Sequence, residues 1–246
     1  MFAAGLLSLA LTVASSAASG SFVHSLSRST AAVAPGHLSA PDCKRHPALT
    51  PVACGCDKLV APAHFNLTFH ATMGDFTVRV TRSDAPIGAD RLYAMSICGD
   101  YLGASAERGN EGSFFRVVPQ FVVQWGIGGL PAVSGAWENL VLDNDAPNKL
   151  SNTRGTLSYA AEQDAAGQAC NRTTQLFINY ADNSRLDALG FTVVGTVSEQ
   201  DMAALDRVVA RWGQEPDQDL IYSQGNAYLA KSFPGLSYTN STSVSK

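Results

Sequence analysis

Charge of either sign is scarce in this chain. Only 15% of its 246 residues are charged, and 17 Lys and Arg stand against 21 Asp and Glu, for a formal net charge of −4. Without a basic excess the chain has little means of neutralising phosphates, so we expect no nucleic-acid partner. Hydrophobic residues make up 46%, and this share with so little charge excludes a largely disordered chain or a coiled coil.

Histidine and the common catalytic motifs are also scarce. All five His residues precede residue 71, so none falls among the later strands and loops. The chain has no Gly-x-Ser-x-Gly elbow, no phosphate-binding loop and no helical His-Glu-x-x-His,. A histidine-based hydrolase is therefore disfavoured, and we expect neither a metal nor a cofactor.

Long apolar runs are confined to the N-terminus. Residues 3–13 are mainly apolar, small residues follow, and the first 18 residues carry no charge. This pattern predicts a secretory signal peptide over residues 1–19. A membrane anchor is the alternative, but the run is short and interrupted by Ser, and no later segment approaches the length of a membrane span. We therefore expect a protein of the endomembrane lumen or the cell exterior, without a membrane span once the signal is removed.

Secretion gives meaning to an odd number of cysteines. In an oxidising compartment five cysteines are expected to form two disulfides and leave one thiol, or to form an intermolecular bond. The pairing stays open among Cys43, Cys54, Cys56, Cys98 and Cys170. Three Asn-x-Ser/Thr sequons, at Asn66, Asn171 and Asn240, predict a glycoprotein.

Hydrophobic patterning divides the rest of the chain into three parts. Residues 20–61 indicate an extended Ser/Ala/Pro-rich arm, residues 62–213 one folded domain, and residues 214–246 a C-terminal extension with a packed tail helix. Alternation and β-branched content predict strands at 64–69, 76–80, 113–125, 155–160, 175–179 and 191–197, with a break at Pro119,. Helices are expected at 88–95 and 199–212, the second capped by Ser198, and loops at 126–135 and 161–173. Short strands with two helices favour a β-barrel or an α+β domain.

Arg116 is unusual because it lies inside an apolar, aromatic strand. It could be an exposed edge residue or half of a buried ion pair. It could equally be a permanently charged donor aimed into an apolar groove.

Four ordered blocks of sequence resemble the cyclophilin family. Residues 114–124 read Phe-Phe-Arg-Val-Val-Pro-Gln-Phe-Val-Val-Gln, which is similar to the signature Phe-His-Arg-Val-Ile-Pro-x-Phe-x-x-Gln. Residues 155–160 resemble the family's Gly-x-Leu-Ser-Met-Ala strand, and residues 174–179 resemble Ser-Gln-Phe-Phe-Ile. Residues 186–197 are similar to the Leu-Asp and Val-Phe-Gly-Lys-Val elements that follow. Order and spacing agree from about residue 64 to about residue 212.

The resemblance implies a mainly β fold, a closed eight-stranded antiparallel barrel capped by two α-helices. It also implies peptidyl-prolyl cis/trans isomerase (rotamase) activity, which assists protein folding on proline-containing polypeptides. Arg116 falls on the catalytic arginine, and Gln124, Ala160 and Gln175 fall on positions that hold the substrate backbone and position the arginine. The proline pocket is expected from Phe114, Phe121, Val122, Phe177 and Leu186, with Phe191 as a further groove wall.

Three departures from the family pattern keep an alternative open. Phe115 replaces the signature His, Phe191 replaces a groove His, and Arg185 stands where many cyclophilins carry the Trp associated with tight cyclosporin binding. The Arg at position 185 predicts weak cyclosporin binding. We also expect a monomer. The alternative function is a catalytically weak cyclophilin-like module that binds Pro-peptides.

Overall fold

The computed structural model describes residues 51–52, 55–98, 110–147 and 150–246. The predicted signal peptide, most of the predicted arm, Cys43 and Cys54 lie outside the described residues. Within the described ranges, none of the helices has the length and hydropathy needed to cross a bilayer.

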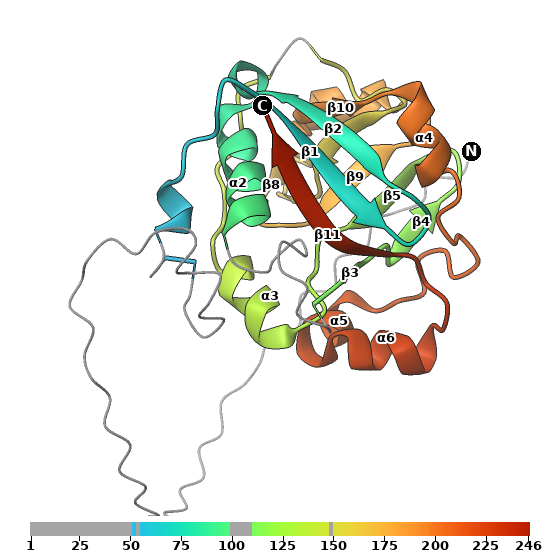
Figure 1. Ribbon diagram of the computed structural model, residues 1–246. Helices are drawn as coiled ribbons and strands as arrows, with labels where there is room; N and C mark the ends of the chain where they lie inside the picture. The colour runs from blue at the N-terminus through green and yellow to red at the C-terminus, as the bar shows by residue number, and fades with distance from the viewer. Residues whose placement is uncertain (1–50, 53–54, 99–109, 148–149) are drawn as a thin grey trace, which may run out of the picture. The chain divides into compact units, whose positions relative to one another are not determined.

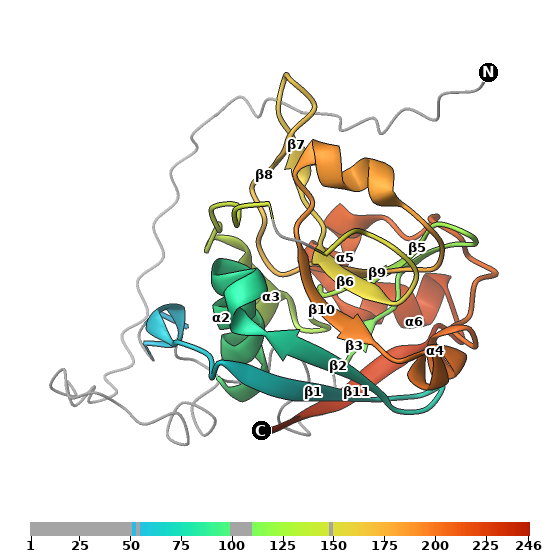
Figure 2. The ribbon, with the colours of Figure 1, turned by 90° about the horizontal axis from the view of Figure 1, so that it is seen from above.

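A single curled antiparallel sheet of nine strands forms the body of the protein (Figures 1 and 2). Its spatial order is β3-β11-β1-β2-β10-β6-β9-β5-β4. The strands are β1 (His64–Ala71), β2 (Phe76–Thr81), β3 (Gly112–Ser113), β4 (Arg116–Val118), β5 (Val122–Trp125), β6 (Thr156–Tyr159), β9 (Leu176–Asn179), β10 (Val193–Val197) and β11 (Tyr238–Ser245). The expected mainly β class is confirmed.

The two edges of this sheet belong to one short stretch of chain. β3 and β4 are separated only by Phe114 and Phe115, so these two residues link the opposite edges. The backbone N–H of Val117 in β4 donates to the carbonyl of Gly213 at 2.8 Å, which covers the exposed edge. The structure is thus a curled sheet linked through the chain, with nine strands, where the sequence predicted a closed barrel of eight.

Helices flank the curled sheet. α2 (Pro86–Ile97) and α4 (Glu199–Leu205) lie at opposite ends of it in both views, and α3 (Pro131–Glu138), α5 (Gln218–Gln224) and α6 (Asn226–Ser232) gather near β3. Ser198 caps α4 by accepting from the backbone N–H of Asp201 at 3.1 Å, as predicted. The helix ends at Leu205 rather than near residue 212, because the chain then turns to bring Gly213 against β4.

Aromatic side chains fill the main core. Phe69 stacks on Phe76 with ring centroids 4.8 Å apart, and Trp125 meets Phe69 edge-on at 5.5 Å. Phe114 packs against Trp125 at 5.3 Å. All four side chains are fully buried, and such contacts stabilise a fold beyond the burial of area alone.

Two predicted loops contain regular structure. Residues 131–138 form α3, which begins at Pro131 in its first turn and buries Trp137; proline is favoured there because its missing N–H would be unpaired anyway. The 161–173 segment forms a hairpin of β7 (Glu162–Gln163) and β8 (Ala169–Cys170).

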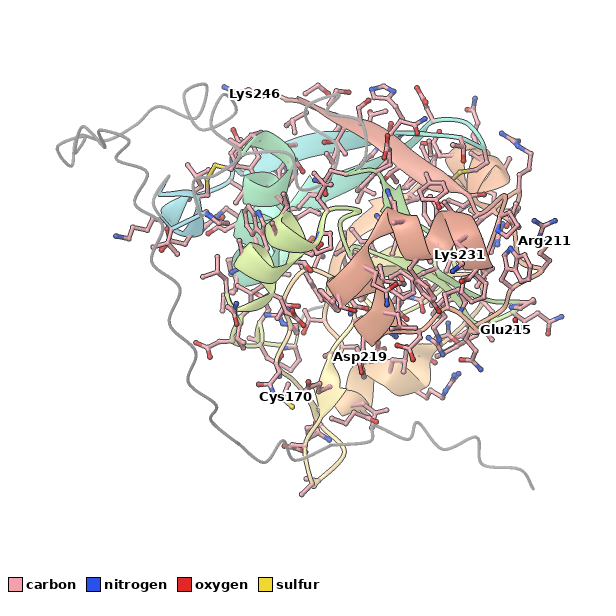
Figure 3. The ribbon with its side chains drawn as sticks, turned by 90° about the horizontal axis from the view of Figure 1, so that it is seen from below. Cys170, Arg211, Glu215, Asp219, Lys231 and Lys246 are labelled. Carbon is pink, nitrogen blue, oxygen red and sulfur yellow. A yellow bond between two sulfur atoms is a disulfide. The ribbon has the colours of Figure 1, made fainter. Side chains whose placement is uncertain are left out.

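The predicted C-terminal extension is built into the sheet. β11 pairs with β1 over most of its length and with β3 near its start. Its sequence is largely Ser and Thr with few apolar residues, which explains why alternation alone did not reveal a strand. α5 and α6 precede it, with the exposed Asp219 and Lys231 on their outer face (Figure 3).

Candidate active site

Strand register places the predicted arginine and its neighbours in one row. Arg116 in β4 is opposite Gln124 in β5, Gln124 is opposite Phe177 in β9, and Phe177 is opposite Ser158 in β6. Paired positions on neighbouring strands present their side chains on the same face. The register therefore gathers residues from four strands onto one face of the sheet.

A chain of hydrogen bonds follows this row. The Nη1 of Arg116 donates to the Oε1 of Gln124 at 3.0 Å, and the Nε2 of Gln124 donates to the Oε1 of Gln175 at 2.7 Å. Gln175 directly precedes β9 and so lies two residues before Phe177, on the same side of the chain. The structure thus brings together Arg116, Gln124 and Gln175 as a connected polar group.

The guanidinium of Arg116 is half-buried and without a carboxylate partner among the described residues. Burial lowers the pKa of Arg116 from its ordinary value, yet that value lies so far above neutrality that the group stays charged. Its Cζ lies 5.8 Å from the centroid of the Phe121 ring. A desolvated permanent charge beside an aromatic wall is suited to donating a strong hydrogen bond.

Beside Arg116 lies a separate apolar cluster. Val122, Phe177 and Leu186 are buried in it, and the half-buried Phe121, Ala160, Leu189 and Phe191 pack against it. Phe177 meets Phe191 edge-on with centroids 6.0 Å apart. Six of the predicted substrate-binding residues therefore meet in one place. Leu189 in η3 (Ser184–Leu189) also belongs to the cluster but was not predicted. Its spacing of three residues from Leu186 could have indicated that both side chains lie on the same side of a helical turn.

Phe114 is not part of this cluster. Its side chain is fully buried in the main core against Phe76 and Trp125, so it has no surface to offer a substrate. Phe114 therefore does not line the proline pocket as expected. Phe114 lies in the linker between the two edge strands, and its ring turns inward instead of toward the face that carries Arg116.

A buried amide network supports the apolar cluster. The Nδ2 of Asn183 donates to the carbonyl of Phe121 at 2.8 Å, and the Nδ2 of Asn152 donates to the carbonyl of Phe191 at 2.6 Å. Asn179 joins the two, donating to the Oδ1 of Asn152 at 3.1 Å and accepting from Asn183 at 2.8 Å. Three isolated Asn residues give no pattern in the sequence, so this network was not predictable from it.

Arg185 lies at the rim of the cluster. Its Cζ is 4.9 Å from the Phe121 ring centroid, and its Nη1 donates to the Oδ1 of Asn183 at 3.1 Å. The side chain is exposed. The guanidinium groups of Arg116 and Arg185 thus both lie over the Phe121 ring.

The described cysteines and sequons lie on several elements. Cys56 and Cys98 form a disulfide, while Cys170 is a free thiol on β8. Figure 3 shows Cys170 on the hairpin that projects from the body of the protein. Asn171 and Asn240 are exposed, and Asn66 is half-buried in β1.

Comparison with known proteins agrees with this fold. The model of the cyclophilin-type peptidyl-prolyl cis-trans isomerase family matches residues 65–221. The chain therefore belongs to this family of enzymes, which catalyse cis-trans isomerisation of peptidyl-prolyl bonds.

Bacterial peptidyl-prolyl cis-trans isomerases are similar to this chain in sequence. Peptidyl-prolyl cis-trans isomerase A of Dickeya dadantii is 38% identical over 140 residues, which cover 54% of this chain and 65% of the relative. The peptidyl-prolyl cis-trans isomerase of Acinetobacter baylyi is 31% identical over 143 residues, with 56% and 68% covered.

A solved structure shows the same fold. The cyclophilin-type isomerase of Cryptosporidium parvum superimposes with a TM-score of 0.50 at 15% identity and covers 74% of this chain and 98% of its own. A second structure of that parasite protein was determined in the presence of the dipeptide Ala-Pro.

Proposed function

We propose that this isomerase accelerates rotation of X-Pro bonds in secretory-pathway or extracellular chains, with Arg116 as its catalytic residue. The observation that carries the proposal is the adjacency of one charged donor and one apolar pocket: Arg116 lies beside Phe121, which walls the cluster of Val122, Phe177 and Leu186. A prolyl ring seated in that cluster would present its nitrogen toward the guanidinium.

The reaction needs little more than these two features. The barrier to amide rotation is about 18–20 kcal/mol because the C–N bond has partial double-bond character. Twisting the bond frees the lone pair of the prolyl nitrogen. A guanidinium donor therefore binds the twisted amide better than the planar one, which is preferential stabilisation of the transition state. Neither a proton transfer nor a nucleophile takes part.

The energies are of a suitable size. A ten-thousandfold acceleration requires about 5.5 kcal/mol of transition-state stabilisation. One charge-assisted hydrogen bond in a desolvated groove supplies a large part of this, and apolar contacts that hold the ring supply more. Gln124 supports the role of Arg116 because its amide oxygen fixes one guanidinium nitrogen at 3.0 Å.

An isomerisation assay on an X-Pro peptide tests the proposal. Arg116→Ala should lower kcat/KM by about 100- to 1,000-fold, as removal of one preorganised donor does elsewhere. Arg79→Ala is the matched control, since Arg79 is exposed on β2, and it should retain the wild-type rate. Equal rates for wild type and Arg116→Ala would overturn the assignment. Peptide binding by the wild type without acceleration would identify a binding module instead.

The secretory setting is supported by the disulfide between Cys56 and Cys98, a bond typical of oxidising compartments, and by the predicted signal peptide. Expression with and without residues 1–19 in a eukaryotic secretory host tests it. We expect only the full chain to be exported and to carry N-glycans at Asn171 and Asn240, seen as a mass that falls on glycosidase treatment. Retention of the full chain in the cytosol would contradict the proposal.

Weak cyclosporin binding is proposed for the same groove, because the exposed Arg185 lies over Phe121 where many relatives carry Trp. Calorimetric titration should show weak binding to the wild type and tighter binding to Arg185→Trp. A stoichiometric block of the wild type would contradict this.

A further inference from the structure

Residues 212–236, here called the C-terminal helical segment, pack on the residue next to the catalytic arginine. Phe115 is buried in a second core cluster together with Ile127, Ile221 of α5, Leu229 of α6 and Leu236, and Trp212 and Tyr222 pack against it. The family signature has His at position 115, and this chain has Phe. The apolar replacement therefore anchors the segment immediately beside Arg116.

One residue of this segment contacts Arg116 directly. The Oε1 of Gln214 accepts from the Nε of Arg116 at 3.1 Å. The preceding residue, Gly213, accepts from the backbone N–H of Val117 at 2.8 Å, so the main chain of the segment is fixed against β4. Arg116 is consequently held by amide oxygens on two of its nitrogens, one from Gln124 in β5 and one from Gln214.

Two further residues reach the same group through Gln175. Its Nε2 donates to the Oε1 of Gln218 at 3.0 Å and to the hydroxyl of Tyr222 at 3.3 Å. Gln218 and Tyr222 are four residues apart in α5 and so share one face of the helix. Asp217 caps that helix by accepting from the backbone N–H of Leu220 at 3.1 Å, which fixes its first turn, including Gln218.

In this series of side-chain hydrogen bonds, the groups at the two ends determine which partner donates in each bond. A guanidinium can only donate, so Gln124 must turn its oxygen to Arg116 and its nitrogen to Gln175. Gln175 must then turn its nitrogen toward α5, where it needs acceptors. Gln218 and Tyr222 provide them, and without them the orientation of the Gln175 amide, and through it that of Gln124, is no longer defined.

We propose that Gln214, Gln218 and Tyr222 are positioning residues that hold Arg116 in its reactive orientation, so that the C-terminal helical segment is part of the active site. The proposal rests on the catalytic role of Arg116 proposed above. Gln214 acts directly on the guanidinium, and Gln218 with Tyr222 acts through Gln175 and Gln124.

Steady-state kinetics separate positioning from general stability. Gln214→Ala should lower kcat about 3- to 10-fold, the net effect of one hydrogen bond whose acceptor is solvent-exposed,, with KM changed less than about 2-fold. The double variant Gln218→Ala, Tyr222→Phe should show a similar loss of kcat. Gln218→Glu keeps an acceptor for Gln175 and should therefore keep a kcat close to that of the wild type. Gln224→Ala is the matched control, because Gln224 is an exposed residue of the same helix, and it should match the wild type.

A second readout does not depend on turnover. In NMR spectra of the full mature protein, the Nε–Hε group of Arg116 should exchange with water faster in Gln214→Ala than in the wild type or in Gln224→Ala. In an Arg116→Ala background, Gln214→Ala should cause no further loss of rate.

The outcomes distinguish the two proposals. If Arg116→Ala is inactive while Gln214→Ala keeps wild-type kcat and Hε exchange, positioning by the segment is overturned and the catalytic role of Arg116 stands. If Arg116→Ala is as active as the wild type, the proposed function fails, and with it the kinetic role of the segment. A loss of rate from Gln214→Ala that persists without Arg116 would indicate a structural effect and would also overturn positioning.

Discussion

At the scale of single residues, Phe115 shows how a departure from a family pattern can be structural. It neighbours Arg116 in sequence but is buried in the cluster with Ile221 and Leu229. Phe115 lies in the linker between β3 and β4, where the chain places Phe114, Phe115 and Arg116 in three different surroundings. A change at position 115 therefore acts on the docking of the C-terminal helical segment rather than on the groove itself.

Restoring the family residue should accordingly be harmful. Phe115→His would bury a polar ring without a designed partner, so we expect a loss of about 1–3 kcal/mol in the free energy of unfolding. Phe115→Leu, which stays apolar, should cost less. Denaturant unfolding followed by fluorescence measures both. A His variant as stable as the wild type would show that the cluster has room for a solvated or bonded imidazole.

At the scale of elements, the junction of α5 and α6 depends on one glycine. Gly225 has φ 62° and ψ −148°, a region open essentially to glycine alone. A Cβ there would lie 2.0 Å from the carbonyl oxygen of Gly129, and that same oxygen accepts from the backbone N–H of Asn226 at 2.9 Å. This close contact between Gly225 and Gly129 packs the junction of α5 and α6 against the loop before α3.

Gly225→Ala should therefore displace the helices, at a cost of roughly 2–4 kcal/mol. Gly167→Ala is the matched control: it also has positive φ, at 79°, but open space around it, so strain alone should cost about 1 kcal/mol. Thermal unfolding compares the two variants. Equal costs would mean that the contact with Gly129 does not constrain the junction.

The disulfide joins two further elements. Cys56 begins η1 (Cys56–Lys58) and Cys98 follows α2, at a sequence separation of 42. Replacing both by Ser frees this loop in the unfolded chain, so the free energy of unfolding should fall by roughly 4 kcal/mol. Cys170→Ser should leave it unchanged, since Cys170 is a free thiol. Similar stability of the double variant and the wild type would show that the bond does not form in the folded protein.

Elements were predictable to the extent that local pattern determines them. The strong alternation at 64–69 and 76–80 gave the β1–β2 hairpin, and Pro119 marked the break between β4 and β5. α3 was missed because glycines surround it, and β11 because a Ser/Thr-rich strand is specified by pairing with β1. The amide network and the contacts of Gln214 depend on long-range packing, which no local pattern encodes.

At the scale of the whole molecule, none of the described residues at the site is a histidine, the side chain that ordinarily titrates near neutrality,. The described histidines, His64 and His70, lie in β1, away from the row that carries Arg116. Burial lowers the pKa of Arg116, so its charged form would first be lost on the alkaline side, far above pH 8. We therefore expect kcat/KM to be constant between about pH 6 and about pH 8. A bell-shaped profile in that range would indicate general acid–base catalysis, contrary to this account.

The whole molecule also explains why so few polar residues mark the function. The proposed mechanism requires one cation beside an apolar pocket. β4 supplies the cation, and β5, β9 and η3 supply the buried residues of the pocket. The low overall charge of the chain is consistent with such a site.

The most direct test of this account is NMR exchange spectroscopy on an Ala-Pro peptide at saturating concentration. Measuring the cis–trans exchange rate of bound peptide separates turnover from affinity. The wild type should show fast exchange, while folded Arg116→Ala should still bind the peptide but show exchange slower by about 100-fold or more. Unchanged exchange on folded, peptide-bound Arg116→Ala would contradict the central role given to this arginine.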